Sequence, residues 1–388
     1  MNLKYKNIKE YLVWMLFFFL PSWMLLQNIL AILLFIFSLI FERKYNYKIL
    51  KNSLLLFVMY LIVNITINDF FITEKNNIIR LLPLVLIPFG LKGLEEKSLI
   101  KGLLFLLIGT LLIQIKSIYS LIEYLNFFNG KKYNLTNYSK LNDILGYERP
   151  YLGFFSAINI LLSYIFYKRR KSLFFLFSGA LSIFLILYLG ARLAFIISSI
   201  FLIYIIYKET GKVKYKMLYV KLGILSIVLF LSLSNSSLIK RFSLLKKDSR
   251  NVIWQGVFNE INTSRSYVFG ISSLEKFNYH LKEFYKNYIG YENEAVRKRF
   301  ISKNYNAHNQ FLTEFVRGGI VGVFLFCFPF FRNFALNLER KNIINILFLI
   351  AIILFLLVEN LLDRQIGVYI VSIFLFISSY LKMKYEKI

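Results

Sequence analysis

His308 is one of only two histidines in the 388-residue chain, and it stands where a long polar segment passes into an apolar run. Asn309 follows it directly, nine residues separate Asn309 from Gly319, and Gly322 comes one helical turn later. Histidine exchanges a proton readily near neutral pH, so His308 could accept the proton of a substrate hydroxyl at the membrane surface. The simpler alternative is that His308 caps a transmembrane helix, with its ring among the lipid headgroups.

The composition indicates that this chain folds in a membrane. Hydrophobic residues make up 57% of the sequence and aromatic residues 18%. A soluble domain of this length has too little interior for them, and apolar runs of about 17 or more residues are typical of transmembrane helices. The first run lacks a small-residue cleavage site, so we expect a retained helix and not a signal peptide. The only cysteine, Cys327, lies within an apolar run, which excludes a disulfide framework and a thiolate metal site.

The spacing of the apolar runs predicts an all-α polytopic membrane protein with about twelve transmembrane helices. A break at Gly190 divides a run that is too long for one bilayer crossing, and the short fourth span carries Pro83 and Pro88. The predicted spans lie near residues 10–22, 24–41, 52–68, 78–91, 102–122, 151–167, 172–189, 191–207, 217–234, 310–331, 343–361 and 365–381.

The net charge of +27 is spread along the chain and does not form one basic patch. Lys and Arg fill alternate gaps between the spans, so we expect membrane lipids as partners and no nucleic acid. This asymmetry places both termini in the cytoplasm and the long segments 123–150 and 235–309 outside. The sequence therefore predicts three regions, which are residues 1–234, a structured outer loop at 235–309, and residues 310–388.

The same topology brings a set of ionisable residues to the outer side. An arginine near hydrocarbon costs several kcal/mol unless it is paired, so its presence there suggests a function. Alternatively, Arg192 is a snorkelling residue at a helix start, and Arg149, which Pro150 follows, is a topological flank. The set consists of Arg149, Arg192, Arg250, His308 and Arg364.

These residue types suit an anionic, phosphate-bearing substrate that is embedded in the membrane. Guanidinium binds phosphate through two parallel hydrogen bonds and keeps its charge. Arginines beside a diphosphate leaving group would stabilise the negative charge that grows on it during a glycosyl transfer. Carboxylates and cysteines are not clustered, which argues against a metal centre, and we expect no cofactor.

The large outer loop carries patterns of its own. An apolar stripe at helical spacing predicts an amphipathic helix lying on the outer leaflet, with His280 in a structural role at its border. Basic residues at 296–299 form a solvated segment or attract an anionic glycolipid. Arg250 precedes Trp254 by one turn, a spacing that also permits a simple cation–π pair. The stripe consists of Leu274, Phe277, Leu281, Phe284 and Tyr288.

Two further polar groups lie in or beside the last spans. Glu314 and Arg317 are three residues apart and are expected to neutralise each other. Glu359 and Arg364 flank a polar turn, where they form a structural ion pair or support the site. The glycines after His308 are expected to permit close helix approach.

These residues resemble the O-antigen ligase and polymerase superfamily. The resemblance rests on His308-Asn309 with Gly319 and Gly322, and it covers about residues 145–375. Weaker matches, in the order expected for the family, are Arg149-Pro150 with Asn159, Gly190-Ala191-Arg192, Arg250-x-x-x-Trp254 with Phe269-Gly270, and the segment from Glu359 to Gly367.

The resemblance implies a GT-C-like glycosyltransferase of the bacterial inner membrane, with its active site facing the periplasm. It implies a metal-independent transfer from an undecaprenyl-diphosphate-linked glycan. Arg149, Arg192 and Arg250 would hold the diphosphate, and His308 would activate the acceptor hydroxyl. The His-Asn-to-glycine spacing favours a ligase that uses an acceptor glycolipid such as lipid A-core. A polymerase of the same superfamily is the first alternative, and a flippase or transporter is the second. Internal repeats, which are typical of transporters, are not apparent.

Overall fold

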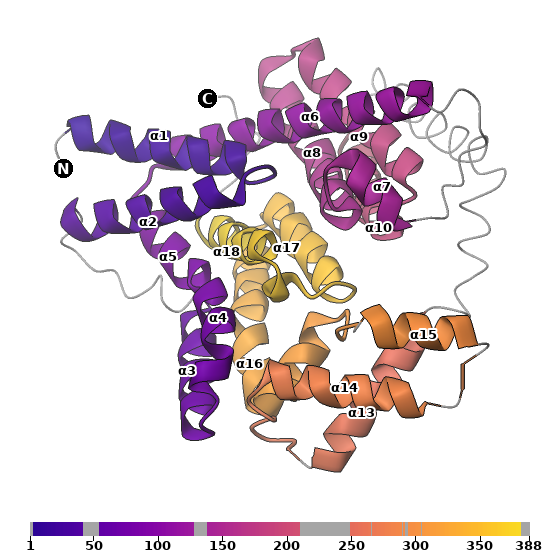
Figure 1. The fold of residues 1–388 in the computed structure, drawn as a ribbon. Coiled ribbons are helices and arrows are strands. Elements are labelled where there is room, and N and C mark those ends of the chain that lie inside the picture. The colour runs from indigo at the N-terminus through magenta and orange to yellow at the C-terminus, as the bar shows by residue number, and fades with distance from the viewer. Residues whose placement is uncertain are drawn as a thin grey trace. The chain divides into compact units, whose positions relative to one another are not determined.

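The computed structural model describes residues 3–41, 54–127, 138–209, 249–264, 266–288, 290–291, 294–303 and 305–381. All regular structure in these ranges is helical, which confirms the predicted all-α class for the described part of the chain (Figure 1). The predicted span at 217–234 and the first part of the predicted outer loop lie outside the described residues.

The chain forms two compact units, which we describe separately. The first unit contains residues 1–9, 28–94 and 247–382, and the second contains 10–27, 95–246 and 383–388. These units combine stretches that are distant in sequence, whereas the three predicted regions are continuous. The boundaries of those regions stay predictions.

Four of the described helices are long and apolar enough to cross a membrane. Shorter apolar helices accompany them, so the structure is that of a helical membrane protein. The count of about twelve spans and the outward orientation of the loop remain predictions. The four are α2 (Met24–Phe41), α8 (Arg149–Arg170), α16 (Gln310–Glu339) and the Glu96–Tyr124 part of α6 (Glu96–Phe127). The shorter ones are α3 (Leu55–Ile67), α9 (Leu173–Leu189), α17 (Ile343–Leu356) and α18 (Gln365–Tyr380).

Helix ends follow the local sequence closely. α1 (Leu3–Phe19) and α2 are joined by a short turn at residues 20–23. α9 ends at Leu189, Gly190 adopts a left-handed conformation with φ 58°, and α10 (Arg192–Glu209) follows, which confirms the predicted break.

The predicted span at 78–91 is wrong as a single helix. α4 (Phe71–Leu81) ends just before Pro83, which lies in the first turn of α5 (Pro83–Gly90). Proline has no N–H to continue a helix but fits the first turn of the next one.

The second unit is built around α8, whose residues from Tyr151 to Phe166 are all buried. α6, α7 (Tyr138–Leu145), α9 and α10 contact it. Amides and hydroxyls inside this unit hydrogen-bond to one another. The Gln114 amide N–H groups donate to Ser156 and Ser182, and those of Asn159 donate to Ser178 and Ser182.

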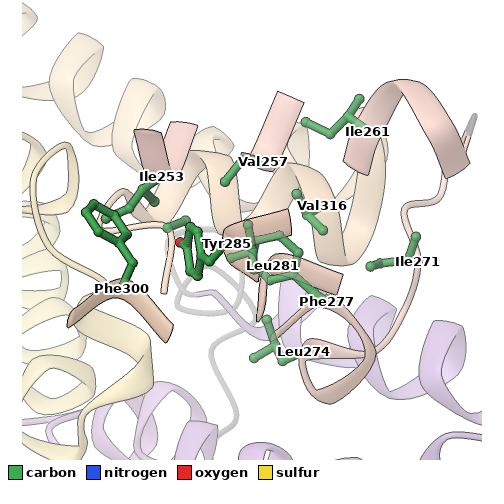
Figure 2. Close-up of a cluster of buried hydrophobic side chains, with 11 residues drawn as sticks. Ile253, Val257, Ile261, Ile271, Leu274, Phe277, Leu281, Tyr285, Phe300 and Val316 are labelled. Atoms are coloured by element: carbon green, nitrogen blue, oxygen red, sulfur yellow. The ribbon is translucent and has the colours of Figure 1, made fainter. Parts of the chain in front are cut away.

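Within the first unit, three helices pack around a hydrophobic core of their own and form what we call the α13–α15 domain, drawn in salmon to orange in Figure 1. They are α13 (Ser249–Ser264), α14 (Leu274–Asn287) and α15 (Glu294–Lys303). Figure 2 shows Phe277, Leu281 and Tyr285 of α14 pointing into this core beside Ile253 and Phe300. The amphipathic helix is therefore confirmed. Its predicted contact with the outer leaflet is wrong, because protein side chains cover the apolar stripe.

Two tyrosines at this core form hydrogen bonds to backbone carbonyls, and one of them reaches the segment that leads to His308. The hydroxyl of Tyr285 donates to the carbonyl of Tyr305, and that of Tyr291 donates to the carbonyl of Tyr285. Burial raises the pKa of Tyr291 to about 12 and raises that of Tyr285 well above its ordinary value. Both hydroxyls therefore remain protonated donors throughout the physiological range.

The α16 helix is broken at Gly319, which has φ 63° and ψ −162°. Residues 267–272, which begin with a turn at 267–269, cross α16 there and supply hydrogen bonds that the helix loses. Ile271 and Ser272 donate their N–H groups to the carbonyls of Val316 and Arg317, at 2.8 and 3.0 Å. On the other side, the N–H groups of Ile320 and Val321 donate to the carbonyls of Tyr267 and Val268, at 2.9 and 3.3 Å.

Glycine is required at this crossing. A Cβ on Gly319 would lie 2.1 Å from the carbonyl oxygen of Val268, and one on Gly270 would lie 2.5 Å from the backbone of Arg317. The glycines were predicted to permit close helix approach. Gly318 and Gly322 do face Tyr60 of α3, whereas Gly319 admits the turn at Val268 and Phe269 and not a helix.

We expect Gly319→Ala to destabilise the protein by at least about 2 kcal/mol, because its backbone conformation is open almost only to glycine and the added Cβ has no room. Thermal unfolding of the purified protein in detergent would measure the loss. Gly322→Ala is the matched control in the same helix, since its Cβ would meet its neighbours at 3.3 Å in ordinary helical backbone. Equal melting temperatures for the two variants would contradict this role of Gly319.

Candidate functional site

His308 lies in the short connection between α15 and α16. Trp254 donates its indole N–H to the carbonyl of Ala307 at 3.1 Å, and Asn309 caps α16 by accepting from the N–H of Leu312 at 3.1 Å. Between these two anchors, His308 takes a left-handed conformation with φ 46°. Non-glycine residues seldom adopt it, and such residues gather at functional sites.

The imidazole of His308 faces a carboxylate. Its Nδ1 lies 3.6 Å from Oε2 of Glu359, and the two side chains are 30% and 25% exposed. The ring of Tyr305 lies beside the imidazole, with 5.9 Å between ring centroids. Glu359 thus contacts His308. This distance exceeds that of a hydrogen bond, and hydrogen bonds in active sites are often longer before substrate binds.

A buried polar network fixes the turn that carries Glu359. The amide of Asn360 donates to the Thr313 hydroxyl and to the Asp363 carboxylate, each at 2.9 Å. Gln310 accepts from the N–H of Leu362 at 2.8 Å. Because Gln310 and Thr313 lie in the first turns of α16, the helix that follows His308 also positions the residue that faces it.

Arg250 reaches the same turn from α13. Its guanidinium donates to the carbonyl of Val358 at 3.2 Å, one residue before Glu359. The structure therefore brings Arg250, His308 and Glu359 together, as the predicted site requires. Arg364, the N-cap residue of α18, ends the turn with an exposed side chain.

Three polar residues of this site were missed in the sequence. Asn306 donates to Asp363 at 3.1 Å, and Gln310 donates to Glu314 at 2.6 Å. Arg80 of α4 donates to the carbonyl of Asp363 at 2.8 Å. Their polar side chains within or beside predicted spans could have marked them as candidates. The sequence did not show which residues they contact, because their partners in the polar turn are far away along the chain.

Glu314 and Arg317 form the predicted pair, with hydrogen bonds of 2.6 and 3.0 Å between guanidinium and carboxylate. Both side chains are buried. The guanidinium carbon also lies 5.7 Å from the centre of the Phe57 ring on α3. Glu314 follows Thr313 directly and accepts a hydrogen bond from Gln310, which in turn accepts one from the polar turn. The ion pair therefore supports the site through Gln310 at the start of α16.

Arg149 and Arg192 belong to the second unit, where they are the first residues of α8 and α10. A Cβ on Gly153 would lie 2.9 Å from the Cβ of Ala191, so these helix starts are in direct contact. Tyr164, near the other end of α8, donates to Glu209 at the end of α10. The two helices are therefore parallel, and their positive dipole ends and their first arginines lie at the same end of the unit.

The apolar helices are those of a membrane protein. Its ionisable site lies at the start of α16, where His308 faces the polar turn. Residues 148–327 match the family model described as O-antigen ligase. The chain thus carries a domain of the O-antigen ligase superfamily, as the sequence motifs indicated. The matched range contains the three predicted phosphate-binding arginines and His308, and it ends before Glu359. A search of curated proteins found no match.

Removing one member of the buried ion pair should be costly, because the partner would stay buried and charged. We expect Glu314→Gln and Arg317→Met each to lower the free energy of unfolding by about 3 kcal/mol. The double variant should recover part of this loss, since neither charge remains. Thermal unfolding of the three variants would test it, and losses that simply add in the double variant would show that the two charges are not coupled.

Proposed function

We propose that this protein is an O-antigen ligase-type glycosyltransferase. It would move a glycan from undecaprenyl diphosphate to a hydroxyl of an acceptor glycolipid such as lipid A-core. The reaction would take place at the periplasmic face of the bacterial inner membrane. The observation that carries this proposal is the contact of Glu359 with His308, which lies just before α16 and within the matched superfamily domain.

In the proposed reaction, His308 acts as the general base. Glu359 faces Nδ1, so the carboxylate favours the tautomer that carries its proton on Nδ1 and leaves Nε2 as the acceptor. Nε2 would take the proton of the acceptor hydroxyl as its oxygen attacks the anomeric carbon. Glu359 then stabilises the imidazolium that forms. The bond from the anomeric carbon to the diphosphate oxygen breaks, and the electron pair leaves with the lipid diphosphate.

Arg149, Arg192 and Arg250 are proposed to bind the diphosphate. The adjacent starts of α8 and α10 support this role, because two parallel helix dipoles and two guanidinium groups create a strongly anion-attracting end. Arg250 contacts the turn that holds Glu359, which places a third guanidinium close to the proposed base. Since these cations stabilise the leaving group, the proposed transfer needs no metal ion, and a chelator should leave its rate unchanged.

Polymerisation is the alternative within the superfamily. The same base and arginines would serve if the acceptor hydroxyl belonged to a second lipid-linked glycan. Purified protein given the lipid-linked glycan and lipid A-core distinguishes the two, because a ligase puts glycan on lipid A-core whereas a polymerase lengthens the lipid-linked chain. A flippase would move the glycolipid across the bilayer without forming a glycosidic bond.

We expect His308→Ala to reduce transfer in this assay by about 10²–10⁴-fold, the usual contribution of a general base. Glu359→Gln should cause a smaller loss because the base remains. His280→Ala is the matched control, since the second histidine also faces a carboxylate, with its Nδ1 2.7 Å from Glu260. Full activity of folded His308→Ala would overturn the proposed role.

We expect Arg192→Lys to slow transfer by about 10²-fold, because an ammonium group keeps the charge but loses the paired hydrogen bonds to phosphate. Arg170→Lys, at the opposite end of the neighbouring helix, should leave the rate unchanged. Both are measured at saturating lipid-linked glycan. An Arg192→Lys rate equal to that of Arg170→Lys would remove Arg192 from the diphosphate site.

A further inference from the structure

Three consecutive apolar residues are exposed in the segment that leads from α13 to α14. Tyr267, Val268 and Phe269 have exposed fractions of 42%, 52% and 60%. Polar or small residues normally occupy an exposed turn in water. In the same domain, α14 turns its apolar stripe inward to the core.

The backbone of these three residues is attached to membrane helices. The carbonyls of Tyr267 and Val268 accept from Ile320 and Val321 of α16, and that of Phe269 accepts from the Asn64 amide of α3 at 2.8 Å. All three carbonyls are thus satisfied within the protein. Backbone inside a bilayer must meet this condition, whereas a turn in water need not.

The exposed side chains of the turn continue a larger apolar surface. α16 is a candidate membrane span, and residues 320–339 beyond its break extend for about 30 Å, the thickness of the hydrocarbon core. Both helices that hold the turn expose apolar side chains along their length. These are Ile320, Phe324, Phe328 and Phe331 of α16, and Leu56, Met59, Val63 and Ile67 of α3.

We propose that Tyr267–Phe269 is inserted into the bilayer and contacts lipid acyl chains. The occupant of this surface is lipid because the turn is continuous with the faces of α3 and α16 that a membrane protein turns to lipid. The turn would anchor the α13–α15 domain to the membrane at the place where α16 is broken. This inference concerns membrane contact alone and is independent of the proposed transfer reaction.

Spin labelling tests the insertion in the full-length protein reconstituted in phosphatidylcholine and phosphatidylglycerol vesicles. Cys327 is the only cysteine and is first replaced by alanine, after which Phe269→Cys is labelled with a nitroxide. Collisions of the label with oxygen, which concentrates in hydrocarbon, are compared with collisions with a water-soluble nickel chelate. Phe324→Cys on α16 is the lipid-facing reference, and Tyr279→Cys on α14 is the reference for the domain surface, with exposed fractions of 64% and 62%.

The proposal expects the label at position 269 to match that at 324, with frequent oxygen collisions and few nickel collisions. A label at 269 that matches the one at 279 would place the turn in water and overturn the proposal. Few collisions with both reagents would mean that protein, such as a second copy of the chain, covers the turn, which overturns it equally. The substituted side chain is exposed and packs on no core, so correct folding of the variant is expected and is checked by size-exclusion chromatography.

Discussion

The passage of residues 267–272 through the break in α16 is the constraint on which the first unit depends. Backbone groups that a broken helix would otherwise leave unsatisfied in an apolar setting each cost several kcal/mol. The crossing segment satisfies them from both sides, and Tyr60 adds a hydrogen bond of 2.6 Å to the carbonyl of Gly318. Neither the break nor the crossing segment would be stable alone, so each depends on the other.

The same crossing orients the helices that follow it. Just after Ser272, the N-terminus of α14 meets the buried carboxylate of Glu74 from α4, which accepts from the Ser273 hydroxyl at 3.0 Å and the Glu275 N–H at 3.1 Å. A carboxylate at a helix N-terminus is favoured by the helix dipole as well as by these hydrogen bonds. The first half of α16, which contacts α3, α13 and α14, then presents Gln310 and Thr313 to the polar turn. In this way α16 determines where His308 and Glu359 lie relative to each other.

Features governed by local sequence were predictable. The length of the apolar run predicted the break at Gly190, because it exceeds one bilayer crossing, and the three-residue spacing predicted the pairing of Glu314 with Arg317. The order of the motifs indicated the superfamily that the matched range confirms. The histidine motif also drew attention to Gly319, although its role was assigned to helix packing.

What the sequence did not disclose depends on contacts between distant segments. The stripe of α14 has the same periodicity whether lipid or protein covers it, so only the fold shows that Ile253 and Phe300 do. Likewise, Asn306 and Arg80 look unremarkable until Asp363 is placed between them. The partner of Glu359 was left open between Arg364 and the site for the same reason, and the structure shows its carboxylate facing His308.

Chemical rescue tests the role of His308 most directly. Folded His308→Ala is assayed for glycan transfer with increasing concentrations of free imidazole, which can occupy the partly exposed space that the side chain leaves. If His308 is the base, imidazole restores transfer in this variant and has no effect on Arg192→Ala, which retains its base. Rates of His308→Ala that stay at the unrescued level at every imidazole concentration would contradict a proton transfer through this residue.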